Sequence, residues 1–169
     1  MSKNINEMSF QDTLDVEQKM IEIMLDICKK KDTNAEWQFI ETHKEKSKFA
    51  RTDGILVKNG YMVASVENRG RYNVTWEYVK SQNSWLLTEA KLLSNIELSK
   101  TLQIPFIFCG FFPNENIYAT LQVTDNKGNV IIKYEVAETW AKKHKNTEDK
   151  VKKRNAYIPI KQFKVYKIY

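Results

Sequence analysis

Two acidic residues bracket a short turn in the first half of the sequence. Asp53 stands at the outer start of one short apolar segment and Glu67 near the end of the next, and the turn Lys58-Asn59-Gly60 separates the segments. Asn and Gly tolerate the positive φ of a tight hairpin. The hairpin would bring Asp53 toward Glu67 and Arg69. Two carboxylates beside a cation can hold Mg²⁺ or Mn²⁺ against a phosphodiester group, because hard cations prefer oxygen ligands.

The type of turn decides whether these side chains can meet. With a two-residue Asn-Gly loop, Asp53 and Glu67 point to opposite sides of the sheet. With a three-residue loop and Gly60 in the left-handed conformation, Asp53 faces Ser65 instead. Glu67 and Arg69 then share its side, because side chains alternate along a strand. The predicted site therefore requires the three-residue turn or a β-bulge.

The remaining pattern predicts a single α/β domain over residues 1–169. We expect a mixed β-sheet flanked by two main helices, with a core at about 12–135, a basic loop at 141–155 and C-terminal strands at 156–169. The expected helices cover 12–31 and 84–102, the second capped by Ser84 or Thr88. Residues 44–51 form a basic connector and 70–81 an irregular segment. The expected strands are 36–43, the two arms of the hairpin, 104–112 as a central buried strand, a second hairpin of 117–124 and 130–136, and short strands at 157–160 and 163–169.

One lysine falls on the apolar side of the second expected helix. At 100° per residue Lys91 lies within the stripe formed by Leu87, Leu98 and Leu102. Two explanations stay open. Its stem can follow the apolar surface while its ammonium reaches solvent, or the ammonium can reach a cluster of acids or a phosphate.

The order of these elements, with an acid on one strand and Glu-x-Arg on the next, resembles the PD-(D/E)XK nuclease superfamily, and small phage-type members in particular. The matching residues are Asp53 and Glu67-Asn68-Arg69, followed by Arg71, the segment Trp85-Leu86-Leu87-Thr88-Glu89-Ala90-Lys91, and Ile104-Pro105-Phe106. The match covers roughly residues 12–135. It implies a restriction-endonuclease-like α-β-β-β-α-β core with a C-terminal β extension. It also implies a metal-dependent nuclease, encoded by a phage or mobile element, that hydrolyses phosphodiester bonds in DNA.

The resemblance assigns roles to individual residues. Asp53 and Glu67 would hold Mg²⁺ or Mn²⁺, and an additional carboxylate would come from Glu41 or from the first helix, where Glu17 and Glu22 lie. A third such carboxylate is common in the superfamily, although each of these glutamates is also compatible with an ordinary solvated position. Many of these enzymes dimerise to cut both strands, so a homodimer is also compatible with the resemblance.

Arg69 departs from the pattern, which has lysine there. A guanidinium binds phosphate well but stays protonated, with a pKa above about 12, so it cannot take a proton from water. Three interpretations stay open. Arg69 acts only electrostatically, or Lys91 on the second expected helix performs the role of the missing lysine, or the site is catalytically inactive. The alternative function is therefore an inactive module of the same fold that binds nucleic acid or a protein.

Charge and composition agree with a nucleic-acid partner without requiring one. The net charge is +6, which suits a polyanion but also fits a lysine-rich proteome. Arg71 and a C-terminal run are the candidate phosphate contacts, with a solvated loop as the competing interpretation of the run. The run comprises Lys142, Lys143, Lys145, Lys150, Lys152, Lys153 and Arg154. Aromatic residues among basic ones, Tyr72, Trp76, Tyr78 and Trp85, could stack on bases, although Trp85 fits a core position better.

Several function classes are disfavoured. No segment has the roughly 20 apolar residues of a membrane span, and the N-terminal residues do not resemble a signal sequence, so we expect a cytoplasmic protein without a membrane partner, in a bacterial host if phage-encoded. Two cysteines and two histidines without Cys-x-x-Cys make a zinc site improbable. No Gly-x-x-x-x-Gly-Lys-[Ser/Thr], Gly-x-Gly-x-x-Gly or nucleophile elbow is present.

Overall fold

The hairpin that carries Asp53 and Glu67 lies inside a six-stranded mixed sheet. The computed structural model describes residues 10–42, 52–142 and 149–169. The strand order is β1-β2-β3-β5-β6-β9, and only the β3–β5 pair is parallel. The strands are β1 (Trp37–Glu41), β2 (Gly54–Lys58), β3 (Tyr61–Gly70), β5 (Phe106–Phe112), β6 (Ile117–Gln122) and β9 (Lys164–Lys167).

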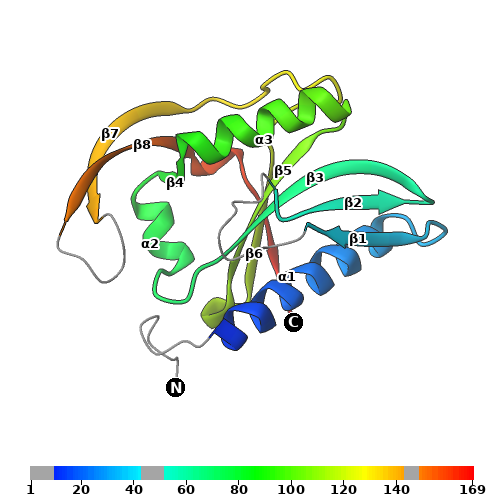
Figure 1. Cartoon of the computed structure of the whole chain (residues 1–169). Coiled ribbons are helices and arrows are strands. Elements are labelled where there is room, and N and C mark those ends of the chain that lie inside the picture. Colours follow the sequence, from blue (N-terminus) through cyan, green and yellow to red (C-terminus); the bar gives the residue numbers. More distant parts are fainter. Residues whose placement is uncertain (1–9, 43–51, 143–148) are drawn as a thin grey trace.

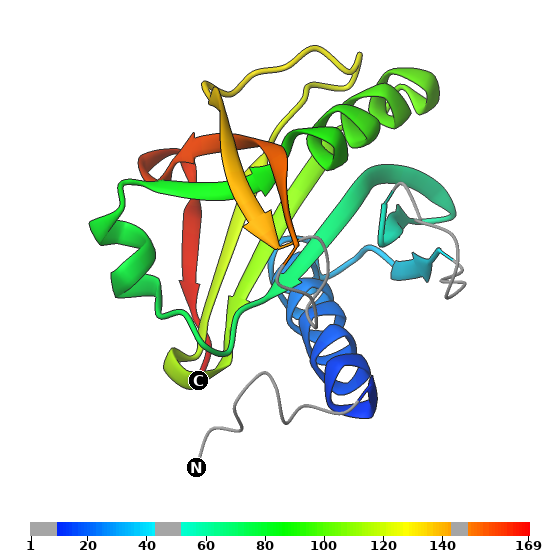
Figure 2. The same cartoon turned by 60° about the vertical axis from the view of Figure 1, so that its left-hand side comes forward.

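A second, antiparallel sheet of three strands has the order β4-β8-β7. Its strands are β4 (Ser84–Thr88), β8 (Lys150–Pro159) and β7 (Glu135–Lys142), and the helices are α1 (Phe10–Lys31), α2 (Trp76–Ser81) and α3 (Glu89–Leu102). Figures 1 and 2 show α1 along one face of the large sheet, with α3 and the small sheet on the other side. The protein is thus an α/β domain, as the sequence predicted, with one more helix and one more sheet than expected.

Two apolar clusters hold these layers together, one on each face of the large sheet. On the α1 face, Met20 and Met24 pack against the β2–β3 hairpin and Phe111. On the other face, the core between the sheets contains the buried side chains of Trp76, Trp85, Leu87, Leu92, Ile96, Phe106, Phe108, Phe112, Ala156 and Ile158. Strand β5 contributes to both clusters, which confirms the prediction of a central strand covered on both sides.

The hairpin turn differs from the predicted three-residue form. Lys58 pairs with Tyr61, and Asn59 and Gly60 have φ of 50° and 81°, as in a two-residue turn with both central residues left-handed. The register then shifts between Leu56 and Val57, so that Gly54 pairs with Val66. A bulge within the strands therefore replaces the longer turn, and it moves the pairing by one residue. A β-bulge was the alternative to the three-residue turn in the sequence analysis.

Other element boundaries also need correction. Residues 84–88 form β4 instead of the first turn of a helix, because they pair with β8, and α3 begins only at Glu89. The segment expected to be irregular contains α2, whose Thr75 side chain accepts a hydrogen bond from the Tyr78 N–H. Residues 130–136 do not form a hairpin strand with 117–124. Only one bridge, between Thr124 and Val130, joins them, and β7 pairs with β8 instead.

The C-terminal basic loop was also predicted wrongly, since residues 150–155 belong to β8. Residues 143–148 and the predicted basic connector at 44–51 lie outside the described residues. None of the described helices is both long enough and apolar enough to cross a membrane.

Candidate active site

Glu67 is a buried carboxylate held between two cations. It lies near the end of β3, with 1% of its side chain exposed. Its Oε1 is 2.7 Å from Nη2 of Arg69, two residues along the same strand, and its Oε2 is 3.0 Å from Nζ of Lys91 on α3. The lysine that the sequence placed on an apolar stripe thus reaches an acid, because α3 packs across β3.

Asp53 lies beside this group, immediately before β2. Its backbone N–H donates to the carbonyl of Val66 (3.0 Å), and one carboxylate oxygen accepts a hydrogen bond from the backbone N–H of Asn68 (2.7 Å). Because Gly54 pairs with Val66, Asp53, one residue before Gly54, comes next to Glu67, one residue after Val66. Without the bulge, Asp53 would stand opposite Val66.

Burial and the neighbouring acid raise the pKa of Glu67 above its ordinary value of 4.5. Desolvation is the largest cause, and the negative charge of Asp53 is the second, while Arg69 and Lys91 act in the lowering direction. Nζ of Lys91 is within hydrogen-bonding distance of Oε2 and lowers the pKa of Glu67 in that way as well as by its charge, but among the described residues neither carboxylate oxygen has a partner at a good hydrogen-bonding angle. We therefore treat these contacts as charge pairing that leaves the hydrogen-bonding capacity of Glu67 incompletely used.

Two further buried polar residues lie on the elements that carry Glu67 and Lys91, and sequence reasoning missed both. Ser65 lies two positions earlier on β3 and therefore on the same face, fully buried, with an Oγ that has no hydrogen-bond partner in the described structure. Asn95 lies one helical turn after Lys91, donates to the Lys91 carbonyl (2.9 Å), and has a buried Oδ1 that likewise lacks a described partner. The available signals were the two-residue spacing from Glu67 and the four-residue spacing from Lys91.

The oxygen donors of the site suit a hard divalent cation, although only two carboxylates supply them. Asp53 and Glu67 supply oxygens, their mutual repulsion would be relieved by a cation, and the oxygens of Glu67 have unused acceptor capacity. The position of Arg69 disfavours cation binding, because its guanidinium already pairs with Oε1 of Glu67. The four charges of Asp53, Glu67, Arg69 and Lys91 sum to zero. Within the described part of the chain, no three acidic, histidine or cysteine residues form a group that could hold a metal.

Glu41 does not join the site. It is exposed at the end of β1, in the same side-chain row as Trp37 and Phe39, which pack on the α1 face. Glu67 and Lys91 lie on the α3 face. The helix α1, which carries Glu17 and Glu22, also lies on the side away from α3 (Figure 1). The structure thus gives no support to a third carboxylate from these positions.

The predicted basic contacts are scattered and largely paired. Arg154 donates to both carboxylate oxygens of Glu89 at the start of α3, and Nζ of Lys152 is 3.6 Å from Glu138 while it lies over the Trp140 ring. Lys153 belongs to the same strand, β8. Lys143 lies outside the described residues, and the side chain of Lys142 is not described.

Arg71 differs from these residues because it continues the row of Glu67 and Arg69 along the chain. Its backbone N–H donates to the Phe111 carbonyl (2.8 Å), which extends the β3–β5 pairing, and its guanidinium lies 5.6 Å from the centre of the Trp85 ring. Desolvation, followed by the like charge of Arg69, lowers the pKa of Arg71. Of the four aromatic residues named from the sequence, Trp76 and Trp85 are core residues and Tyr78 is exposed.

Comparison with protein-family models, with curated proteins and with solved structures gave no match.

Proposed function

We propose that this chain is a metal-dependent nuclease that hydrolyses phosphodiester bonds, with DNA as its substrate. The observation that carries the proposal is the buried carboxylate of Glu67, which is adjacent to Asp53 and paired with Lys91, a helical residue 24 positions later in the sequence. A purely structural role explains such a group poorly, because burying charged side chains is costly and apolar residues would pack at least as well. Charged groups kept in a site with a raised pKa are characteristic of catalysis.

Each residue can contribute to phosphodiester hydrolysis in a different way. Asp53 and Glu67 would hold Mg²⁺ or Mn²⁺, which when bound polarises the phosphate and acidifies a water molecule. Lys91 has three N–H donors, so that one can remain on Glu67 while others orient a water molecule or contact a phosphate oxygen. Arg69 stays charged and binds phosphate oxygens in pairs. An incoming phosphate would draw Arg69 away from Glu67, which frees Oε1 at the moment when substrate arrives.

One observation favours the second candidate, a non-catalytic nucleic-acid-binding module of the same fold. Arg69 occupies Oε1 of Glu67 at 2.7 Å, and the net charge of the four residues is already zero. In that case the group would serve as a structural ion-pair network and would bind no divalent cation.

A cleavage assay with matched variants separates the two candidates. Plasmid and linear DNA are incubated with Mg²⁺, Mn²⁺ or EDTA, using wild-type protein, Asp53→Asn, Glu67→Gln and Arg69→Lys. We expect metal-dependent cutting by the wild type, a loss of at least about 100-fold in the two carboxylate variants, and retained cutting in Arg69→Lys. Asp26→Asn is the control, since Asp26 forms an exposed ion pair with Lys30 on α1.

Isothermal titration of Mn²⁺ into wild-type protein and Glu67→Gln supplies a readout apart from turnover. Cutting that survives in both Asp53→Asn and Glu67→Gln would refute the assignment of the site. No cutting and no Mn²⁺ binding by any variant, together with salt-sensitive DNA binding, would establish the second candidate.

A further inference from the structure

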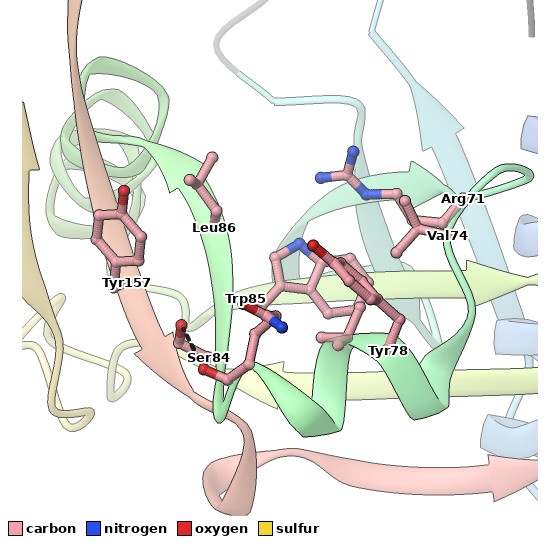
Figure 3. Close-up of a pocket in the computed structure, with 9 residues that line it drawn as sticks. Arg71, Val74, Tyr78, Ser84, Trp85, Leu86 and Tyr157 are labelled. Carbon is pink, nitrogen blue, oxygen red and sulfur yellow. Dashed lines mark hydrogen bonds between the residues drawn. The ribbon is translucent and has the colours of Figure 1, made fainter. Parts of the chain in front are cut away.

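A pocket lies next to the candidate active site, at the end of the side-chain row that begins with Glu67. Its volume is about 470 Å³, and Figure 3 shows the lining side chains. They come from the chain after β3, from α2, from β4 and from β8, namely Arg71, Val74, Tyr78, Val79, Gln82, Ser84, Trp85, Leu86 and Tyr157. The pocket thus joins the two sheets and is available only in the folded molecule.

Arg71 gives the pocket a positive charge that no carboxylate of the described residues pairs. Its guanidinium extends toward β4 in Figure 3 and stacks over Trp85. The like charge of Arg69 acts on this guanidinium and, after desolvation, contributes to its lowered pKa. A half-buried cation in this setting is best stabilised by an anion from outside the chain.

The aromatic side chains supply apolar surface of fixed orientation. The Trp85 ring packs so closely on Gly110 of β5 that a Cβ there would lie 2.0 Å from the ring, so the ring cannot shift toward the sheet. Its buried Nε1–H has no acceptor among the described residues. Tyr78 and Tyr157 line the pocket from α2 and β8, and 57% of Tyr78 is exposed. An aromatic lining around an unpaired cation suits a flat ring attached to a phosphate.

The backbone of β4 adds hydrogen-bonding groups. This strand is the edge of the small sheet and pairs on one side only, with β8. The N–H and C=O groups of its other side face no described strand, and the edge of a base can satisfy such groups.

We propose that this pocket binds one unpaired nucleotide of a single-stranded segment, with its base against Tyr78 and Tyr157 and its phosphate on Arg71, whose guanidinium is held over the buried ring of Trp85. The proposal rests on the proposed function, because it makes the pocket the neighbour of the phosphate held at Glu67. Arg71 lies four residues beyond Glu67 along extended backbone, about 13 Å away, a distance suited to a nucleotide close to the reacting one. The volume falls in the usual range for small-ligand sites. A base whose edge hydrogen-bonds to the free side of β4 cannot at the same time pair with a complementary base, so the proposed site selects an unpaired nucleotide.

Binding measured without metal tests the pocket independently of cleavage. Fluorescence anisotropy in EDTA compares a labelled single-stranded oligonucleotide with the blunt duplex of the same sequence. The variants are Tyr78→Ala, Tyr157→Ala and Arg71→Lys. Tyr61→Ala serves as the control, because Tyr61 is 77% exposed at the distant hairpin turn. Thermal melts check that each variant is folded.

We expect the wild type to prefer the single strand. Each tyrosine variant should bind it about tenfold more weakly, as the loss of one stacked base requires, with duplex binding unchanged. Quenching of a 2-aminopurine base in the single strand should disappear in the same variants. Equal affinity of wild-type and tyrosine variants for the single strand, or a wild-type preference for the duplex, would overturn the proposal.

The outcomes for the two proposals are separable. Duplex cleavage that continues unchanged in the tyrosine variants, together with unaltered single-strand binding, refutes the pocket and leaves the nuclease intact. Loss of single-strand binding in these variants, in a protein that never cleaves, supports the pocket and refutes the nuclease.

Discussion

Replacing Lys91 by Met should make the stability of this protein depend strongly on pH. The substitution keeps an apolar stem of similar length and removes the ammonium that lies 3.0 Å from Oε2 of Glu67. Glu67 is 1% exposed and, of the cations that the described structure places beside it, would keep only Arg69. Breaking a buried ion pair by removing one partner typically costs about 3–5 kcal/mol, since the remaining charge stays desolvated.

Protonation of Glu67 limits this cost. The carboxyl can take up a proton in the folded state, and the free energy required is about 1.36 kcal/mol for each pH unit above its ordinary pKa of 4.5. The cost of removing Lys91 can therefore not exceed about 0.7 kcal/mol at pH 5 or about 5 kcal/mol at pH 8. We expect a loss of about 2–4 kcal/mol at pH 8 and of less than about 1 kcal/mol at pH 5.

The sign follows from the direction of the pKa shift. Because burial raises the pKa of Glu67 in the folded protein, the folded state binds more protons than the unfolded state between pH 4.5 and the raised pKa. The contribution of Glu67 to the free energy of unfolding therefore falls as pH rises through that window, and it stays constant at higher pH. Loss of Lys91 raises the folded pKa further, so the fall continues to higher pH in the variant.

Urea unfolding followed by tryptophan fluorescence at pH 5, 6, 7 and 8 measures the effect. Lys80→Met is the matched control, because Lys80 pairs with Glu77 at the surface and its loss should cost no more than about 0.5 kcal/mol at any of these pH values. The double variant Glu67→Gln, Lys91→Met should lose the pH dependence. The reasoning would be refuted if Lys91→Met lowered the free energy of unfolding by the same amount at every pH. A loss below about 0.5 kcal/mol at pH 8 would also refute it.

Two predictions concern the packing around this site. Gly110→Ala should cost about 1–3 kcal/mol in urea unfolding, because its Cβ would meet the Trp85 ring at 2.0 Å. Gly60→Ala, which meets nothing within 4 Å, should cost only the strain of its φ of 81°, about 1 kcal/mol, and equal losses for the two would contradict the packing argument. Complete burial raises the pKa of the Cys109 thiol to about 12, so it should react with a thiol reagent at pH 8 only after unfolding. The half-buried Cys28, whose pKa is also raised by burial, should react first. If the folded Cys28→Ser variant reacted with one equivalent of the reagent, this prediction would be wrong.

The local pattern of the chain was sufficient for the elements that surround the candidate site. The apolar periodicity of α1, the Asn59-Gly60 turn and the continuous apolar run of β5 are properties of neighbouring residues, and the structure confirms all three. The same reasoning failed at β4. Its short apolar segment is compatible with either a helix or a strand, and pairing with β8, some 70 residues later, decides between them.

The sequence by itself determined which charged residues could form the candidate site, because Asp53, Glu67, Arg69 and Lys91 were all identifiable from type and spacing. Only the tertiary structure decided that they meet. The bulge that sets Asp53 beside Glu67 depends on strand register, and the contact with Lys91 depends on how α3 crosses β3. The shifted pKa of Glu67 is likewise a tertiary property, since desolvation arises from distant segments that exclude water. For the same reason the pocket beside Arg71, built from four segments, has no counterpart in any local pattern of the chain.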